Sequence, residues 1–304
     1  MANNRPNSQS RNAACWCGSG KRFKRCHGKN SKSAQQDPFS RFGDDVVAYY
    51  GDPSSGEALF VRRDHIWEEL RDKSSKIAEE FDKVFFKDLD DISQEFAKFA
   101  LILQVGLKEL PDKPDSIQRK CAAVLWNAGE GILAALELVR RGYPLQPGIL
   151  LRTCVEAVAV AFDLVANRES QQRLVAGRYS SDNVVTRAKR FFRVTPKLYG
   201  FLSANMSHVG EPHFRTYSRQ ASSEEAATGL MFVKATTALI GIATELLFNH
   251  AYAETRYWMR TPDGALQFSP NEEVLKFVRD FPQLLSADEE TLPEDRTVSL
   301  PPTA

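Results

Sequence analysis

The sequence predicts a mainly α-helical protein in which a short N-terminal cysteine module precedes a multi-helix bundle. From Asp64 onward, apolar residues recur at steps of three and four in five or more successive segments, which is the period of an amphipathic helix. The same region contains no convincing strand pattern. Three of the five cysteines, in contrast, fall within residues 15–26. Helices that bury their apolar faces against one another are therefore expected over residues 64–286.

The charge distribution separates the N-terminus from the rest of the chain. Of the 304 residues, 42% are hydrophobic and 26% charged, which is ordinary for a globular protein. Residues 1–33 carry eight of the 40 Lys and Arg residues and no acidic residue, which leaves 32 basic against 39 acidic residues elsewhere. A basic arm on an acidic body is typical of a segment that meets RNA, an anionic surface or an acidic protein.

The region before the bundle is predicted to be largely irregular. Residues 1–13 are polar, are expected to be disordered, and lack the apolar core of a signal peptide. The cysteine module occupies residues 14–29. Residues 30–63 are interpreted as a linker and irregular segment because Gly, Pro and Ser interrupt them. Within this segment, residues 45–50 and 58–61 are predicted to pair as a short hairpin.

Caps and helix breakers delimit the predicted helices. Pro111 and Pro114 end the second helix, Asp115 with Gln118 resembles a capping box at the next, and Gly142 stops that helix. The acidic, Pro-rich tail at residues 287–304 is predicted to be disordered. The predicted helices span residues 64–85, 91–110, 115–141, 145–166, 169–191, 196–208 and 228–252.

One apolar stretch, residues 229–248, is long enough to cross a membrane. It contains Lys234 and Glu245, and each charge would cost roughly 2.5–3.5 kcal/mol on insertion. A buried helix in a bundle is the better interpretation, and no membrane association is expected.

The cysteine module has the residue types of a metal site. Three thiols and an imidazole, those of Cys15, Cys17, Cys26 and His27, fall within thirteen residues. Thiolate sulfur and imidazole nitrogen are preferred ligands of tetrahedral Zn²⁺. The Gly18-Ser19-Gly20 turn lets the chain reverse between the two ligand pairs. The spacing predicts one structural Zn²⁺ with a closed coordination sphere, and it disfavours a redox role for the first two cysteines.

The same residues resemble a known module. Cys-x-Cys-Gly-Ser-Gly-Lys-x-Phe-Lys-x-Cys-His-Gly, at residues 15–28, closely resembles the SEC-C motif of the C-terminal tail of the translocase ATPase SecA. One departure is Trp16, which stands where the family usually has Pro. The resemblance implies zinc binding and docking to a chaperone, ribosome or other partner. By that resemblance, the contact residues are Trp16, Lys21, Arg22, Phe23, Lys24 and Arg25. The alternative interpretation is that the cations only balance the negative thiolate–zinc site.

The remaining cysteines and the absence of a disulfide framework favour a reducing, cytoplasmic setting. Cys121 and Cys154 lie in apolar helical patterns and are interpreted as small buried hydrophobic residues.

Polar residues interrupt the apolar helix at residues 145–166. Arg152 and Glu156 share a face because they lie four positions apart, and Asp163 continues that face. They are interpreted either as a polar pocket or, in preference, as a structural salt bridge, since buried charges must be paired.

Residues 203–213 form a second polar cluster that contains Ser207, His208, Glu211 and His213. Two histidines and a glutamate suggest a metal site or a general base, but Gly210 and Pro212 break the helix between them, and a capping or core histidine is the favoured interpretation of His208.

The body is loosely similar to an uncharacterised bacterial all-helical domain family that co-occurs with SEC-C motifs. That resemblance implies no established activity, but it suggests that Arg152, Glu156, Ser207 and His208 converge between helices.

Two functions follow from these patterns. The leading hypothesis is a zinc-binding adaptor whose module docks to a protein or ribonucleoprotein, with the helical body as effector or scaffold; nucleic-acid binding by the basic arm is compatible with it. The alternative is a HEPN-like helical ribonuclease of the defence type that uses Arg152, Glu156 and His208, although the Arg/His spacing of that class is absent from the body. The sequence contains no phosphate loop, nucleophile elbow or dinucleotide fingerprint. Enzymatic activity and oligomeric state stay open.

Overall fold

The computed structural model describes residues 10, 12–15, 19–26, 45–51, 55, 57–110, 116–189, 194–215, 219–249, 255–262, 264–279 and 297–298. The chain divides into two compact units, Met1–Lys73 and Ser74–Ala304. The second unit is called the helical domain below. The prediction of a mainly α-helical protein is confirmed.

The first unit contains the predicted hairpin. Strands β1 (Val46–Gly51) and β2 (Ala58–Arg62) pair antiparallel, and a register shift between Val46 and Ala48 marks a bulge. A short helix, α1 (His65–Trp67), continues as the π-helical turn η4 (Glu68–Lys73). The predicted hairpin is thus present within a segment whose composition indicates mainly irregular structure.

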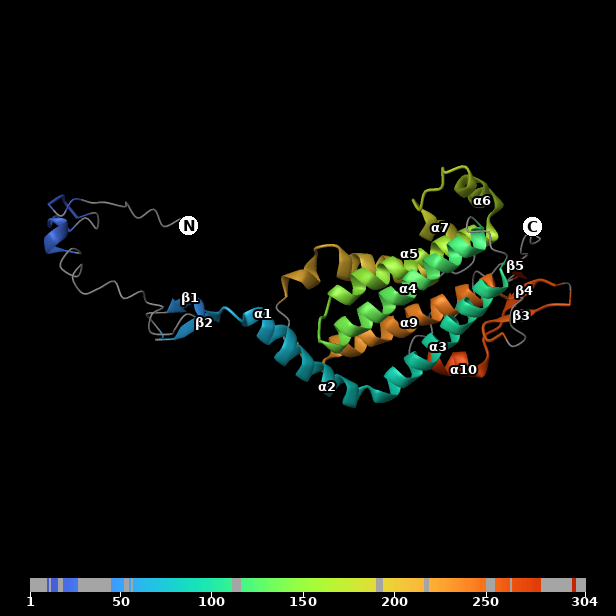
Figure 1. Cartoon of the computed structure of the whole chain (residues 1–304), viewed down its shortest axis with the longest axis horizontal. Helices are drawn as coiled ribbons and strands as arrows, with labels where there is room; N and C mark the ends of the chain where they lie inside the picture. Colours follow the sequence, from blue (N-terminus) through green and yellow to red (C-terminus); the bar gives the residue numbers. More distant parts are fainter. Residues whose placement is uncertain are drawn as a thin grey trace. The chain divides into compact units, whose positions relative to one another are not determined.

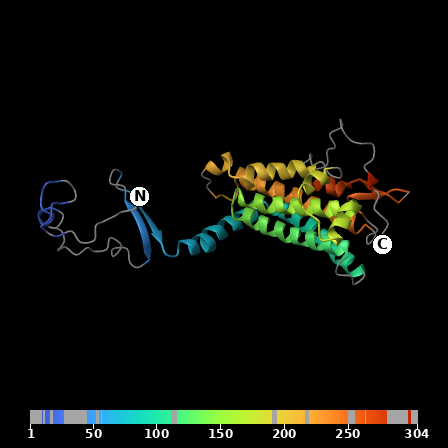
Figure 2. The ribbon, with the colours of Figure 1, turned by 90° about the horizontal axis from the view of Figure 1, so that it is seen from above.

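The helical domain is built on four long helices. Helices α4 and α5 pack closely against each other, and both contact α9, which α3 also contacts (Figures 1 and 2). The helices are α2 (Ser74–Val84), α3 (Phe86–Glu109), α4 (Ile117–Arg140), α5 (Gln146–Ala166), α6 (Arg168–Val175), α7 (Val184–Ala188), α8 (Val194–Leu202), η5 (Ser203–Ser207), η6 (Glu211–Phe214), α9 (Glu224–Leu247) and α10 (Glu272–Phe277).

Helix α9 is the centre of the core. Every residue from Phe232 to Phe248 is buried. Helices α4 and α9 are both long and apolar enough to cross a membrane by length and composition, but 94% of the most apolar window of α9 is buried inside the domain, against 39% for α4. Helix α9 is therefore a core helix, as its two charges predict.

The two buried charges of α9, Lys234 and Glu245, have partners. The Lys234 ammonium lies 2.7 Å from Asp88 Oδ1 at the start of α3 and over the ring of Phe277 in α10. The Glu245 carboxylate accepts backbone N–H bonds of 2.8–3.1 Å from Arg256 and Tyr257. Burial raises the pKa of Glu245, against the lowering effect of these N–H donors. The two charges thus fix the elements around α9 instead of facing lipid.

A small sheet at the C-terminal part of the domain is not predicted by the sequence. Strands β3 (Trp258–Arg260), β4 (Leu266–Phe268) and β5 (Thr297–Val298) pair antiparallel in that order. Strands this short give almost no alternation to detect. They dock because the Trp258 indole N–H donates to the Ile242 carbonyl of α9 at 2.9 Å. Residues 287–304 are predicted from the sequence to be disordered, but Thr297 and Val298 in this tail pair with β4.

Three of the differences from the predicted helix boundaries have local reasons. The helix expected over residues 169–191 is divided into α6 and α7, since Gly177 adopts a left-handed φ of +66°. Ser116 is the N-cap of α4, because its hydroxyl accepts the Arg119 N–H at 3.2 Å; Asp115 lies outside the described residues. Helix α9 begins at Glu224, capped by Ser223, four residues before the predicted start.

The contact between α3 and the end of α9 predicts a destabilising glycine substitution. A Cβ added at Gly106 would lie 2.3 Å from the ring of Phe248, which is fully buried. We expect Gly106→Ala to lower the free energy of unfolding by about 2 kcal/mol, measured by urea denaturation, because overpacking outweighs the gain in helix propensity.

Gly200 provides the matched control for this substitution. It is also helical, and nothing lies within 4 Å of an added Cβ. Gly200→Ala should therefore stabilise the protein by roughly 0.5–1 kcal/mol. Equal effects of the two variants would show that the α3–α9 contact is looser than described.

Candidate functional site

The described part of the cysteine module folds back on itself. Residues Ala14 and Arg22 form an antiparallel bridge, and the Cys15 N–H donates to the Lys21 carbonyl at 2.8 Å. Gly20 turns the chain with a φ of +69°, a conformation that side chains with a Cβ rarely adopt. The 3₁₀ turn η1 (Phe23–Arg25) then leads to Cys26, whose N–H donates to the Phe23 carbonyl at 3.1 Å.

Two of the four predicted metal ligands lie in this fold. Cys15 is only 5% exposed and Cys26 is half-buried. The Ser19 hydroxyl of the Gly-Ser-Gly turn donates to Cys26 Sγ at 3.4 Å, so Ser19 and Cys26 are close. Cys17, His27 and Trp16 lie outside the described residues. Thiols from the turn and from the element after it suit a soft-ligand metal site, and a zinc ion there would cross-link the two elements.

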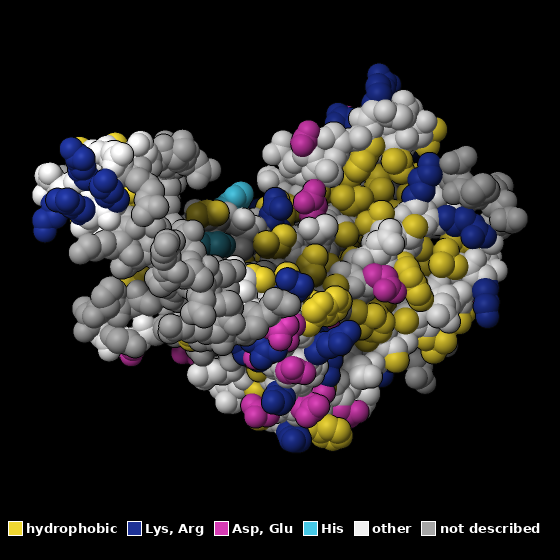
Figure 3. Space-filling model, turned by 60° about the vertical axis from the view of Figure 1, so that its left-hand side comes forward, with side chains coloured by type: hydrophobic (Ala, Val, Ile, Leu, Met, Phe, Trp, Pro, Cys, Tyr) yellow, Lys and Arg dark blue, Asp and Glu magenta, His cyan; other side chains and the backbone are white. Residues whose placement is uncertain are grey.

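The basic residues of the module are accessible. Lys21, Arg22 and Arg25 are exposed, while Phe23 and Lys24 are half-buried. Figure 3 shows Lys and Arg side chains grouped on the N-terminal unit at the left of the view. The predicted contact residues within the described part are thus on the surface or at its edge.

In the helical domain, Arg152 bonds to a different partner from the one predicted. Its Nε donates to Ser203 Oγ at 2.9 Å, and its Nη2 donates to the Tyr199 hydroxyl. The guanidinium also stacks over the Tyr199 ring, 4.7 Å from its centroid. Both Arg152 and Glu156 are described, and the ion pairs of the described residues do not include one between them. The arginine therefore connects α5 to α8 and η5 instead of forming the favoured salt bridge with Glu156.

The second polar cluster lies on and after the π-helical turn η5. The Ser207 hydroxyl is buried and has no hydrogen-bond partner among the described residues, and His208, which follows it, is exposed. His213 accepts the Gly210 N–H at its Nδ1 at 3.3 Å, which is a local structural role. Ser203 brings Arg152 to the same turn as Ser207, but a catalytic arrangement with Glu156 and His208 stays a prediction.

The third charge of α5, Asp163, is fully buried and anchors a network that the sequence does not reveal. Its Oδ2 accepts from Arg187 Nη2 at 2.9 Å, from Arg187 Nε at 3.1 Å and from the Ser170 hydroxyl at 2.8 Å. Its Oδ1 accepts from Asn167 Nδ2 at 3.2 Å. Burial raises the pKa of Asp163, but these donors outweigh burial and hold the pKa below its ordinary value. The rule that buried charges are paired predicts a partner for Asp163, although its identity, 24 positions away, follows only from the fold.

The two remaining cysteines have the predicted character. Cys121 and Cys154 are buried in the core, and burial raises the pKa of each thiol to about 12. The Cys154 thiol donates to the Ala128 carbonyl of α4 at 3.2 Å. Thiols held protonated in this way are neither nucleophiles nor metal ligands.

These features define a helical-bundle protein with a separate, folded cysteine module at its N-terminus. Residues 11–29 of this chain match the SEC-C motif, which is a zinc-binding type of module. No curated protein and no solved structure matches the chain. The resemblance of the module is thereby confirmed, while the loose resemblance of the helical body has no support from these comparisons.

The Asp163 network predicts a stability loss with a specific pH dependence. Arg187→Met would leave a fully buried carboxylate without its cation, so we expect the free energy of unfolding at pH 7 to fall by about 2–4 kcal/mol. In the folded wild type the pKa of Asp163 lies below its ordinary value. The stability that Asp163 contributes is therefore fully present above about pH 4 and is lost as the pH falls through the folded-state pKa. In Arg187→Met, burial without a cation should raise the pKa of Asp163. The carboxylate of the variant should then be protonated near pH 4, where the difference in free energy of unfolding between variant and wild type should be smaller than at pH 7.

Arg173→Met is the control for this prediction, measured by urea denaturation at both pH values. Arg173 pairs with Glu169 at 2.5 Å, and both side chains are more than half exposed. Such a pair contributes about 0–1 kcal/mol. A loss at Arg187 no larger than at Arg173 would contradict the role given to the buried carboxylate.

Proposed function

We propose that this protein is a cytoplasmic zinc-binding adaptor. In this proposal Cys15, Cys17, Cys26 and His27 hold one structural Zn²⁺, and the basic surface of the SEC-C module docks to a protein or ribonucleoprotein partner. Zinc supplies a cross-link that holds the module's small fold together. The helical domain serves as effector or scaffold.

The observation that carries the proposal is the SEC-C match over a module whose cations are accessible. Residues 11–29 match the motif, and Lys21, Arg22 and Arg25 are exposed around a protected Cys15. If these cations only balanced the negative charge of a thiolate–zinc centre, their side chains would be expected to lie against that centre. Exposed ones are available to an anionic partner surface, where they steer association.

The hairpin of the same unit favours a partner that includes protein. Tyr50 and Leu59 are paired across β1 and β2, and they are 63% and 70% exposed. Phe60 and Val61 are each 44% exposed. Exposed apolar side chains gathered on one hairpin mark a protein-interaction surface more often than an RNA-binding one. Basic and apolar surfaces within one unit together suit a protein or ribonucleoprotein.

The zinc assignment predicts the metal content of the purified protein. We expect one zinc per chain by elemental analysis, and less than about 0.1 per chain in Cys26→Ser, because three ligands and a hydroxyl bind zinc far more weakly. Cys154→Ser is the control, since a hydroxyl can keep the bond to the Ala128 carbonyl. Far-ultraviolet circular dichroism should show the helical domain intact in both variants. A metal content unchanged in Cys26→Ser would contradict the ligand set.

The docking assignment predicts the effect of charge reversal in a module that keeps its ligands. In affinity capture from native lysate, Lys21→Glu/Arg22→Glu should reduce recovery of specific partners at least about tenfold, because two favourable charge contacts become repulsive. Treating a parallel sample with nuclease separates partners held through RNA from those held through protein.

The control reverses two exposed cations of the helical domain, Lys83 and Lys87. Lys83→Glu/Lys87→Glu changes the net charge by the same amount outside the module and the hairpin, and recovery should match the wild type. Equal recovery with both double variants would mean that the module's basic surface is not the docking surface.

A further inference from the structure

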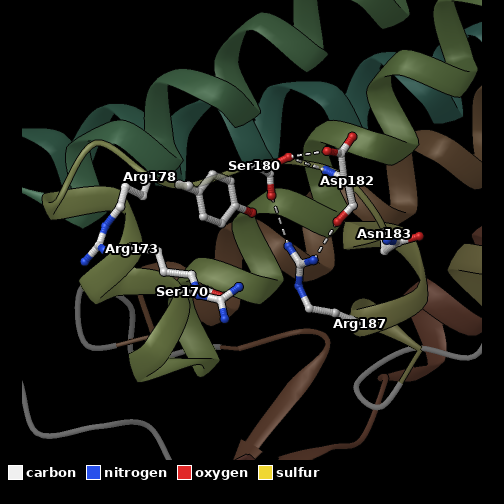
Figure 4. Close-up of a pocket in the computed structure, with 8 residues that line it drawn as sticks. Ser170, Arg173, Arg178, Ser180, Asp182, Asn183 and Arg187 are labelled. Atoms are coloured by element: carbon white, nitrogen blue, oxygen red, sulfur yellow. Dashed lines mark hydrogen bonds between the residues drawn. The ribbon is translucent and has the colours of Figure 1, made fainter.

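A polar pocket lies beside the Asp163 network and shares Ser170 and Arg187 with it. It has a volume of about 240 Å³ and lies between α6, the following loop and α7 (Figure 4). Three arginines line it, Arg173, Arg178 and Arg187, together with hydroxyl and amide side chains that include Ser170 and Asn183. Arg173 and Arg178 lie together on one side in Figure 4, and Arg187 lies on the other. The pocket is therefore flanked by guanidinium groups on two sides.

The end of α6 brings the first two arginines together. The Arg178 N–H donates to the Arg173 carbonyl at 2.8 Å and the Gly177 N–H to the Leu174 carbonyl at 3.0 Å, with Gly177 in the left-handed region. This is a Schellman ending, in which residues five positions apart come side by side. A neighbouring hollow of about 370 Å³ is lined by the same two arginines with Glu169 and Gln172.

The opposite side is fixed in place. Arg187 is held by Asp163, and its Nη1 donates to the Asp182 carbonyl at 2.6 Å. The Asp182 carboxylate, which also lines the pocket, accepts from the Ser180 hydroxyl at 2.7 Å. These bonds give the pocket a preorganised wall, which lowers the ordering cost of binding a ligand.

The charges on the first side are still available. Arg178 is exposed, and its guanidinium has no hydrogen bond or ion pair in the part of the chain that the structure describes. Arg173 is held only by Glu169, in an exposed pair that contributes about 0–1 kcal/mol and is easily exchanged for another anion. Arg187, in contrast, is already neutralised by Asp163. Because the Asp182 carboxylate also lines the pocket, a ligand would find a net charge of between zero and about one positive here, carried by the guanidinium groups of Arg178 and Arg173.

We infer that this pocket binds the phosphate group of a small phosphate monoester. The guanidinium groups of Arg173 and Arg178 both line the pocket, and arginine recognises phosphate oxygens with paired, charge-assisted hydrogen bonds. At about 30 Å³ per water, the pocket has the volume of about eight waters, enough for a phosphate with a sugar-sized group. The inference does not depend on the proposed adaptor function, because the pocket belongs to the helical domain.

Isothermal titration calorimetry on the full-length protein tests this inference with ribose 5-phosphate and inorganic phosphate as probes. Ribose and malonate are the controls for the sugar and for a dianion that is not a phosphate. We expect ribose 5-phosphate to bind more tightly than phosphate, and both to bind more tightly than malonate, with no heat from ribose. Binding of ribose alone, tighter binding of malonate, or no heat from either phosphate probe at about 10 mM would overturn the inference.

Substitutions locate the binding to this pocket. Arg178→Gln and Arg173→Gln should each weaken ribose 5-phosphate binding at least about tenfold, because each removes a charge-assisted contact. Arg168→Gln is the matched control, since Arg168 is exposed on the same helix but does not line the pocket. Its affinity should stay within about twofold of the wild type. Equal losses in all three variants would show only a general charge effect and overturn the site.

Discussion

The structure of the helical domain depends on the burial of α9. A helix that is buried from Phe232 to Phe248 needs neighbours on every side, and α3, α4 and α5 supply them. Its two charges then determine what else must be present. Lys234 requires Asp88 at the start of α3, and Glu245 requires the backbone N–H groups before β3. An unpaired charge in this position would cost several kcal/mol, so these contacts constrain which elements pack around α9.

A related constraint joins α3 to the chain after α9. Glu95 of α3 accepts from Arg256 Nη1 at 2.8 Å and from the Tyr257 hydroxyl at 3.2 Å, and it is only 6% exposed. Tyr257 in turn donates its backbone N–H to Glu245. Two buried carboxylates therefore share one segment of chain, and Arg256 supplies the cation next to them. This explains why a sheet of very short strands is held at a defined place on the bundle.

The sequence predicts those parts of this protein whose signals are local. The periodic apolar residues locate α4 and α5 to within two residues of their observed ends, and the SEC-C spacing is found in the comparisons. Partners distant in the sequence are different. Asp163 has no local pattern that indicates Arg187, and Arg152 lies four residues from Glu156 yet bonds to Ser203, 51 positions away. Helical spacing fixes which side chains share a face, but the packing of other helices decides which of them are paired.

The position of the Asp163 network gives the polar pocket a physical basis. A buried carboxylate is tolerated only with a cation beside it, and here that cation comes from α7, across the loop that follows α6. The network thereby holds α6, its loop and α7 against α5. The same arrangement leaves Arg173 and Arg178 at the Schellman end of α6, where both line the pocket. A contact that stabilises the fold thus also shapes a cavity in which Arg173 is held by the exposed Glu169, so an anion can bind there without displacing the buried ion pair of Asp163 and Arg187.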